Sequence, residues 1–379
     1  MTTQVYQNSR AFDSKEYMVH EADFAQLDKP RPLGLTGHLR ARDEAMSLRA
    51  CLDSCLPFLD ELIVTYQDST DETEEILLEY AAKYPEKIRL FWYPLEYGTR
   101  YGKDAVVPLG HMVNFSNYGY LKTSYHYYMK IDADQIYFTE KMCQIREVLC
   151  SLPKQKNTGC TLPKWWLAFL KSYQKKKDII LTKFSHTKRK ETFIDIIKYG
   201  LQLKQPVSFK ISGVNIFFSN NQFMALNSVD PFNGYAGDTT ILAPSPVGRY
   251  VMRGTLYESF RTSCPTLRIS LGFTWIHTGP IKRKDIDDGS TLCPLEDIAQ
   301  QPWKRVRSHI QSNCIWNKVG LHKLKSQIAL GEKFWEKDMY TYFTPVFYNT
   351  YFPKMLAYVQ KNYKNTIAHG DILRGITKK

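Results

Sequence analysis

The sequence predicts an α/β fold in which a mostly parallel sheet is flanked by helices. Three observations lead to this prediction. Short apolar segments alternate with longer segments of helical periodicity from about residue 33 onward, and polar, turn-forming residues follow the apolar segments. The chain of 379 residues is long enough for one large α/β domain with an extension.

Five elements are expected in the N-terminal half of this domain. Residues 33–39 and 62–65 are apolar or β-branched and predict two strands, and residues 88–92 predict a third. Between them, apolar positions recur at helical spacing over 44–58 and 72–84. This alternation favours right-handed crossovers and a parallel sheet, in which ligands bind beyond the carboxyl ends of the strands.

The chain is expected to divide into three parts. Residues 1–32 form an N-terminal lead-in, residues 33–280 form the α/β domain, and residues 281–379 form a mostly helical, basic C-terminal extension. Residues 164–204 are expected to be a basic, aromatic insertion, with 11 basic and 3 acidic residues. A solvated helical face, a segment at an anionic membrane surface and an acceptor-binding surface all fit that composition.

Charge and composition narrow the class of protein. The net charge is +13, and residues 151–379 carry 35 basic against 15 acidic residues, so this part is expected to face an anionic partner. No apolar run approaches the ~20 residues of a membrane span, and the N-terminus lacks the apolar core of a secretory signal. The eight cysteines have no framework spacing. We expect a cytoplasmic protein, with peripheral contact at the inner face of the membrane as an open alternative.

The sharpest candidate site is an Asp-x-Asp motif after an apolar strand. Asp132 and Asp134 follow residues 127–131 with one residue between them. At the end of a strand, both carboxylates can turn toward one divalent cation and leave its other positions for water and phosphate oxygens. An Asp-x-Asp turn is also common at exposed positions that have no function. The neighbouring motifs are therefore needed to distinguish a metal site from such a turn.

The order of the surrounding motifs resembles that of the GT-A glycosyltransferases, particularly family 2. The resembling motifs are Arg42-Asp43-Glu44, Cys51-Leu52-Asp53-Ser54, Asp60-Glu61-Leu62-Ile63-Val64, Ser69-Thr70-Asp71-Glu72-Thr73, Asn117-Tyr118-Gly119, Ser212-Gly213-Val214-Asn215 and Phe232-Asn233-Gly234-Tyr235-Ala236-Gly237-Asp238. The resemblance covers about residues 33–280. It implies a Rossmann-like sheet that binds a nucleotide-sugar donor.

The resemblance implies roles for individual residues on the metal and donor side. Asp132 would contact the donor ribose or share the metal, and Asp134 would bind the Mn²⁺ or Mg²⁺ that bridges to the pyrophosphate. His277 would complete the metal shell, although a histidine after an aromatic strand is more often structural. The other donor-binding residues implied are Arg40, Gln67, Asp68 and Asn117.

The nucleotide base is the point at which the sequence departs from the family. Family members usually carry an aspartate at the end of the second strand, where it reads uracil, and Tyr66 stands there in this sequence. The Gln67 amide can both donate to and accept from a uracil ring, and Asp68 is the alternative. The identity of the base is therefore open.

The acceptor side follows from the same resemblance. Asp238 stands where the family places its general base, although the same aspartate could cap a helix expected from about residue 239. Ser212, Gly213 and Trp275 are expected to bind the acceptor. With one base and no second nucleophilic carboxylate, direct displacement with inversion is expected, by analogy with inverting hydrolases.

The sequence therefore predicts an inverting glycosyltransferase of the hexosyltransferase type. We expect a nucleotide-sugar donor, UDP-linked, and as acceptor a hydroxyl of a bacterial-type surface glycan, such as lipopolysaccharide or capsule, or of a lipid-linked saccharide. Two alternatives stay open: a sugar-phosphate nucleotidyltransferase, and a protein that binds nucleic acid or an anionic surface without catalysis. The first lacks its Gly-rich phosphate loop after strand one, and the second lacks a known nucleic-acid motif, so no nucleic-acid partner is expected.

Overall fold

The structure, a computed structural model, describes the following residues: 14–93, 112–151, 193–202, 207–215, 217–219, 222–226, 239–253, 257–262, 267–279 and 292–294. The helical elements are α1 (Ser14–Tyr17), η1 (Glu21–Asp28), α2 (Ala45–Cys55), η2 (Leu56–Phe58), α3 (Thr73–Lys83), α4 (Met112–Leu121), α5 (Thr139–Ser151) and α7 (Phe193–Gln202). The strands are β1 (Leu35–Ala41), β2 (Glu61–Tyr66), β3 (Ile88–Trp92), β4 (Tyr127–Asp132), β5 (Gln135–Tyr137), β6 (Val207–Asn215), β7 (Phe217–Ser219), β8 (Gln222–Leu226), β9 (Thr240–Ile241), β10 (Gly248–Arg253), β11 (Tyr257–Thr262), β12 (Leu267–His277) and β13 (Leu292–Pro294).

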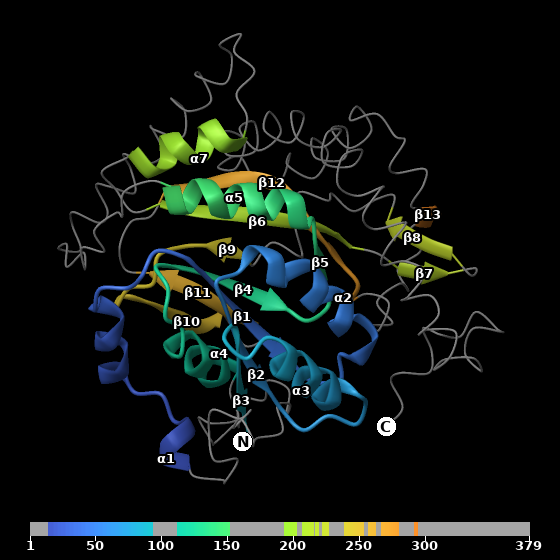
Figure 1. The fold of residues 1–379 in the computed structure, drawn as a ribbon, viewed down its shortest axis with the longest axis horizontal. Helices are drawn as coiled ribbons and strands as arrows, with labels where there is room; N and C mark the ends of the chain where they lie inside the picture. Colours follow the sequence, from blue (N-terminus) through green and yellow to red (C-terminus); the bar gives the residue numbers. More distant parts are fainter. Residues whose placement is uncertain are drawn as a thin grey trace.

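A parallel sheet with the strand order β3-β2-β1-β4 forms the centre of the fold (Figure 1). Side chains alternate between its two faces, as strand geometry requires. On β1, Leu35 and Leu39 join the apolar core under α2 and α3, whereas His38 and Arg40 face α4. The α/β fold with a mostly parallel sheet, predicted from the sequence, is confirmed.

A second sheet, β5-β12-β6-β9, continues beyond β4. Tyr128 on β4 and Leu242, just after β9, exchange backbone hydrogen bonds of 2.8 and 3.0 Å, which joins the two sheets. The helices α5 and α7 contact each other, and α7 packs on β12 and β6 (Figure 1). The chain passes from the first sheet to the second within the short turn between β4 and β5.

The face of the parallel sheet opposite α2 and α3 is covered by α4 and by the antiparallel hairpin β10–β11. The side-chain amide of Asn117 in α4 accepts from the backbone N–H of Tyr250 at 2.8 Å and donates to its carbonyl at 3.0 Å. The hydroxyl of Tyr250 lies 2.7 Å from that of Tyr128 on β4. The hairpin is thus fixed to both the helix and the sheet.

The ends of the described region refine the expected domain organisation. Within the lead-in, α1 and η1 pack against the domain with Tyr17 and Phe24 buried. Of residues 281–379 the structure describes only β13, a strand that pairs with β8, so the expected helical character lies outside the described residues. Most of the insertion, residues 164–192 and 203–204, also lies outside them. Within the described part of the chain, no helix combines the length and the apolar character that crossing a bilayer requires.

Candidate functional site

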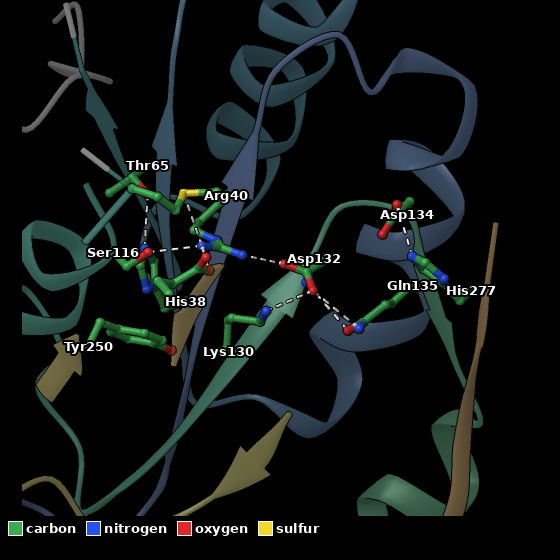
Figure 2. A network of polar contacts seen from close by, with 12 residues as sticks. His38, Arg40, Thr65, Ser116, Lys130, Asp132, Asp134, Gln135, Tyr250 and His277 are labelled. Atoms are coloured by element: carbon green, nitrogen blue, oxygen red, sulfur yellow. Dashed lines mark hydrogen bonds and ion pairs between the residues drawn. The ribbon is translucent and has the colours of Figure 1, made fainter. Parts of the chain in front are cut away.

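The Asp-x-Asp motif lies at the carboxyl end of a parallel strand, where the sequence placed it. β4 ends at Asp132, and Asp134 occupies the turn before β5. Figure 2 shows that the two carboxylates face different partners: Asp132 points toward Arg40 and Lys130, whereas Asp134 points toward His277. The two carboxylates therefore belong to two separate, neighbouring groups of polar side chains.

The Asp134 site is built by the turn after β4 and the end of β12. Asp134 Oδ2 lies 3.2 Å from His277 Nε2, and His277 stands opposite Gln135 in the register of β12 and β5. The backbone N–H and the hydroxyl of Thr278 both donate to the carbonyl oxygen of Asp134, at 2.8 and 2.9 Å. A Cβ at Gly279 would lie 2.3 Å from Asp134 Oδ2 and 2.7 Å from His277 Nε2. The glycine therefore leaves room beside both atoms.

These residues fit a divalent cation that is shared with a ligand. A carboxylate oxygen and an imidazole nitrogen converge beside Gly279, and this donor set suits Mn²⁺ better than Mg²⁺, which prefers oxygen. Among the residues that the structure describes, no three His, Cys, Asp or Glu side chains form a complete metal-binding cluster. Asp134 and His277 would thus leave several coordination positions for phosphate oxygens and water.

The Asp132 carboxylate is held from both sides by cations. Arg40 Nη2 donates to Oδ1 at 2.8 Å, Lys130 Nζ lies 3.1 Å from Oδ2, and Gln135 Nε2 donates to the same oxygen at 3.4 Å. Burial alone would raise the pKa of Asp132, but the charges of Lys130 and Arg40 outweigh it and hold this pKa well below its usual range. The side chain is 29% exposed, so an ionised carboxylate faces the site.

Arg40 lies behind Asp132, between two carboxylates. Its Nη1 donates to Glu258 Oε1 at 2.5 Å and to Ser116 Oγ at 2.9 Å, and its side chain is only 10% exposed. Binding of the nucleotide-sugar donor by Arg40 remains a prediction, and in the structure Arg40 contacts Asp132, which is also expected to bind that donor. The sequence reasoning missed Lys130 and Glu258. Lys130 stands two residues before Asp132 on the same strand face, which was an available signal, whereas Glu258 has no local signal.

His38 continues the polar layer next to Arg40 (Figure 2). It is fully buried, with Nε2 2.9 Å from Thr65 Oγ1 and Nδ1 3.3 Å from the Tyr128 hydroxyl. Burial and, next, the charge of Arg40 lower the pKa of His38 to about 3. The imidazole is therefore neutral at ordinary pH and serves as a structural hydrogen-bonding group.

The residues expected to read the base lie just beyond β2. Gln67 is buried, and Asp68 is exposed and accepts a hydrogen bond from Trp92 Nε1 at 2.8 Å. The adjacent loop after β1 has Asp43 in the left-handed region at φ 52°, where its carboxylate accepts from the backbone N–H of Thr70 at 2.7 Å. The loops after β1 and β2 are thus fastened together, and base recognition by Gln67 or Asp68 stays a prediction.

The residues expected on the acceptor side have structural contacts of their own. Trp275 is fully buried with its ring centroid 6.0 Å from that of Tyr137, and a Cβ at Gly213 would lie 2.0 Å from Trp275 Nε1. Gly213 is therefore needed for the packing of Trp275. Ser212 stands opposite Phe273 in the pairing of β6 with β12. Acceptor binding by these residues stays a prediction, as does donor binding by Asn117, whose amide holds the hairpin.

Asp238, the expected general base, lies outside the described residues. The segment that follows it corrects one alternative interpretation. Residues 240–241 form the strand β9, not the beginning of a helix, because they pair with β6 across the second sheet. No helix therefore begins at residues 239–241, where the sequence predicted one.

One protein-family model matches the N-terminal part of this chain. Residues 13–158, which contain the parallel sheet and the Asp-x-Asp turn, match the family model described as CgtA, a beta-1,4-N-acetylgalactosaminyltransferase. This part of the chain is therefore similar to a glycosyltransferase family. A comparison of the whole chain with curated proteins finds no match.

Several solved structures are remotely similar to this chain. One is TarS of S. aureus, with 12% identity and a TM-score of 0.33, covering 78% of this chain and 42% of that chain. Another is glucosyl-3-phosphoglycerate synthase of M. tuberculosis in complex with Mn²⁺, UDP-glucose and phosphoglyceric acid, with 19% identity and a TM-score of 0.20, covering 35% of this chain and 43% of that chain. The chain thus spans about two fifths of the length of these first structures. Scores this low carry no conclusion about the site.

Proposed function

We propose that the protein transfers a sugar from a nucleotide-sugar donor to an acceptor hydroxyl, with a divalent cation bound at Asp134 and His277. The observation that supports this most is the pairing of these two side chains at 3.2 Å, beside the space that Gly279 leaves open. The carboxyl end of a parallel strand is where such folds bind ligands. The match of residues 13–158 to a glycosyltransferase family model supports the same class of reaction.

We assign binding of the nucleotide-sugar donor to the ionised carboxylate of Asp132 and to the loops after β1 and β2. A nucleoside diphosphate leaves poorly until the negative charge that develops on it is neutralised. A bound Mn²⁺ or Mg²⁺ would neutralise this charge as a Lewis acid. Asp134 and His277 would hold the cation, and Asp132 would accept hydrogen bonds from the donor ribose. Gln67 and Asp68 would bind the base, for which we propose uracil because the Gln67 amide matches its O4 and N3–H.

On the acceptor side, we assign the role of general base to Asp238. Its carboxylate would take the proton of the acceptor hydroxyl while that oxygen bonds to the anomeric carbon and the bond to the diphosphate breaks. A single displacement of this kind inverts the anomeric configuration. Ser212 and Gly213 would line the acceptor side, with Trp275 packed behind them, and the proposed acceptor is a surface glycan or a lipid-linked saccharide.

The experiment that tests the proposal is a thermal-shift panel of nucleotide sugars with and without Mn²⁺. Because the matched family model describes an N-acetylgalactosaminyltransferase, the panel starts with UDP-N-acetylgalactosamine and includes UDP-N-acetylglucosamine, UDP-galactose, UDP-glucose and GDP-mannose. We expect a UDP-sugar to raise Tm, and to do so only when Mn²⁺ is present, since only a bound ligand stabilises the folded state. No stabilisation by any nucleotide sugar would overturn the proposal.

Peripheral contact with the membrane is a separate part of the proposal. The basic and aromatic composition of residues 164–204 suits a segment at the headgroup boundary of anionic lipid. We expect the full chain to cosediment with vesicles that contain phosphatidylglycerol, and a variant that lacks residues 164–190 to stay in the supernatant. Equal sedimentation of the full chain and the variant would contradict the proposed membrane contact and would leave the proposed sugar transfer unaffected.

A further inference from the structure

One guanidinium connects two carboxylates that the sequence keeps far apart. Arg40 binds Asp132, 92 residues away in the sequence, and Glu258, 218 residues away. We infer that Glu258 is a positioning residue for Asp132: through Arg40 it fixes the direction in which the Asp132 carboxylate faces the donor. The inference rests on the proposed function in one respect: Asp132 has to contact the nucleotide-sugar donor.

The geometry leaves the guanidinium little freedom. Arg40 uses one terminal nitrogen for each carboxylate, with Nη2 2.8 Å from Asp132 Oδ1 and Nη1 2.5 Å from Glu258 Oε1. A planar group that is held at both ends by charge-assisted hydrogen bonds has a fixed orientation. Ser116 Oγ accepts from Nη1 as well, at 2.9 Å. Glu258 thus holds the Arg40 guanidinium from the end opposite to its contact with Asp132.

Docking of the hairpin does not require the charge of Glu258. The hairpin is already fastened through Tyr250, by its backbone to the Asn117 amide at 2.8 and 3.0 Å and by its hydroxyl to Tyr128 at 2.7 Å. Glu258 and Arg40 are both nearly buried, with side chains 9% and 10% exposed. Burying an ion pair costs desolvation energy that apolar packing avoids, so such a pair is weak evidence for a role in stability. Orienting Arg40 is the role that the geometry supports.

Loss of Glu258 should therefore act on donor binding and not on the chemical step. Without it, the Ser116 hydroxyl and the Met112 thioether are the partners that Nη1 keeps among the described residues, and the guanidinium can turn about its contact with Asp132. Glu258 itself touches no reacting atom in the proposed mechanism. The donor KM should rise while kcat stays within about twofold.

The first test needs no ligand. Side-chain ¹⁵N spectra of Arg40, assigned with Arg40→Lys, should show separate signals for the two terminal nitrogens in the wild-type protein, because each is held by a different carboxylate. Glu258→Gln should merge them, whereas Glu258→Asp, which keeps the charge, should keep them separate. Tyr250→Phe is the matched control on the same hairpin, and it should also keep them separate. Unchanged signals in Glu258→Gln would overturn the inference.

The second test is a double-mutant cycle on UDP affinity, measured by calorimetry with Mn²⁺. Glu258→Gln should weaken UDP binding about tenfold, the effect of one charge-assisted hydrogen bond. In an Asp132→Asn background the same change should cost less than about twofold, because the residue through which it acts is gone. An equal loss in both backgrounds contradicts positioning through Asp132. If the wild-type protein does not bind UDP, the proposed function fails, and the arginine spectra still decide the inference about Glu258.

Discussion

The Asp134 carboxylate and the His277 imidazole lie 3.2 Å apart, although 143 residues separate them in the sequence. Their proximity follows from backbone geometry. The turn after β4 carries Asp134, and Thr278, next to His277, donates two hydrogen bonds to the Asp134 carbonyl oxygen, at 2.8 and 2.9 Å. Backbone contacts therefore hold both side chains next to each other, and the cation that we propose here would need little rearrangement to bind.

The first prediction concerns this pair. Asp134→Asn and His277→Ala should each lose the Mn²⁺-dependent stabilisation by UDP, because each removes one of the two proposed protein ligands. At a UDP concentration 100 times Kd, the wild-type protein gains about 2.7 kcal/mol, which thermal unfolding measures directly. The control is Glu79→Gln, which removes an exposed ion pair with Arg49 on the outer side of α3. Retention of metal-dependent stabilisation in both variants would show that the cation binds elsewhere.

The second prediction uses the space beside the pair. A methyl group in Gly279→Ala would lie 2.3 Å from Asp134 Oδ2 and 2.7 Å from His277 Nε2, so one of these side chains has to move. Such overpacking costs about 1–3 kcal/mol, and UDP binding in Mn²⁺ should weaken at least about tenfold. Gly248→Ala is the control: its Cβ would meet Phe260 at 2.9 Å in the hairpin, and UDP affinity should not change. Calorimetry on both variants separates loss of the site from loss of stability.

The third prediction concerns the proposed base. Asp238→Asn should bind UDP and Mn²⁺ as the wild-type protein does, because the donor side is untouched. Turnover should fall about 10²–10⁴-fold, the usual contribution of a general base. Steady-state kinetics with the donor identified by thermal shift, together with UDP calorimetry, measures the two effects separately. Unchanged kcat in this variant would remove Asp238 from the mechanism.

Hydrophobic patterning was sufficient to predict the central sheet. Residues 88–92 were expected as a strand and form β3, because their apolar side chains pack locally on α3 and its neighbours. The first strand was expected over 33–39, and β1 runs from Leu35 to Ala41. The apolar pattern ends before β1 does, because Arg40 is charged. The strand continues through Arg40 because the carboxylates of Asp132 and Glu258, from other elements, neutralise its charge. Local apolar patterning does not reveal charges that are paired at long range.

The same distinction applies to the site. The Asp-x-Asp turn was predictable because a strand followed by two closely spaced carboxylates is a local pattern, and His277 was placed beside it by family resemblance. Glu258 was not predicted, because nothing near residue 258 indicates that its carboxylate meets Arg40 through the docking of the hairpin. Tertiary contacts of this kind depend on how β10 and β11 pack on the sheet, which the spacing of motifs does not encode.

The fourth prediction follows from His38, whose pKa is lowered to about 3 by burial and by the charge of Arg40. In the unfolded chain a histidine titrates near about 6.5. Between these two values the unfolded state binds a proton that the folded state does not, so stability should fall by about 1.4 kcal/mol for each pH unit below about 6.5. His38→Gln keeps hydrogen-bonding groups near Thr65 and does not titrate, so its stability should depend less on pH. Urea unfolding of both proteins at several pH values from 7.5 down to about 4.5 measures the difference. Parallel curves for the two proteins would mean that the pKa of His38 is the same in the folded and the unfolded chain.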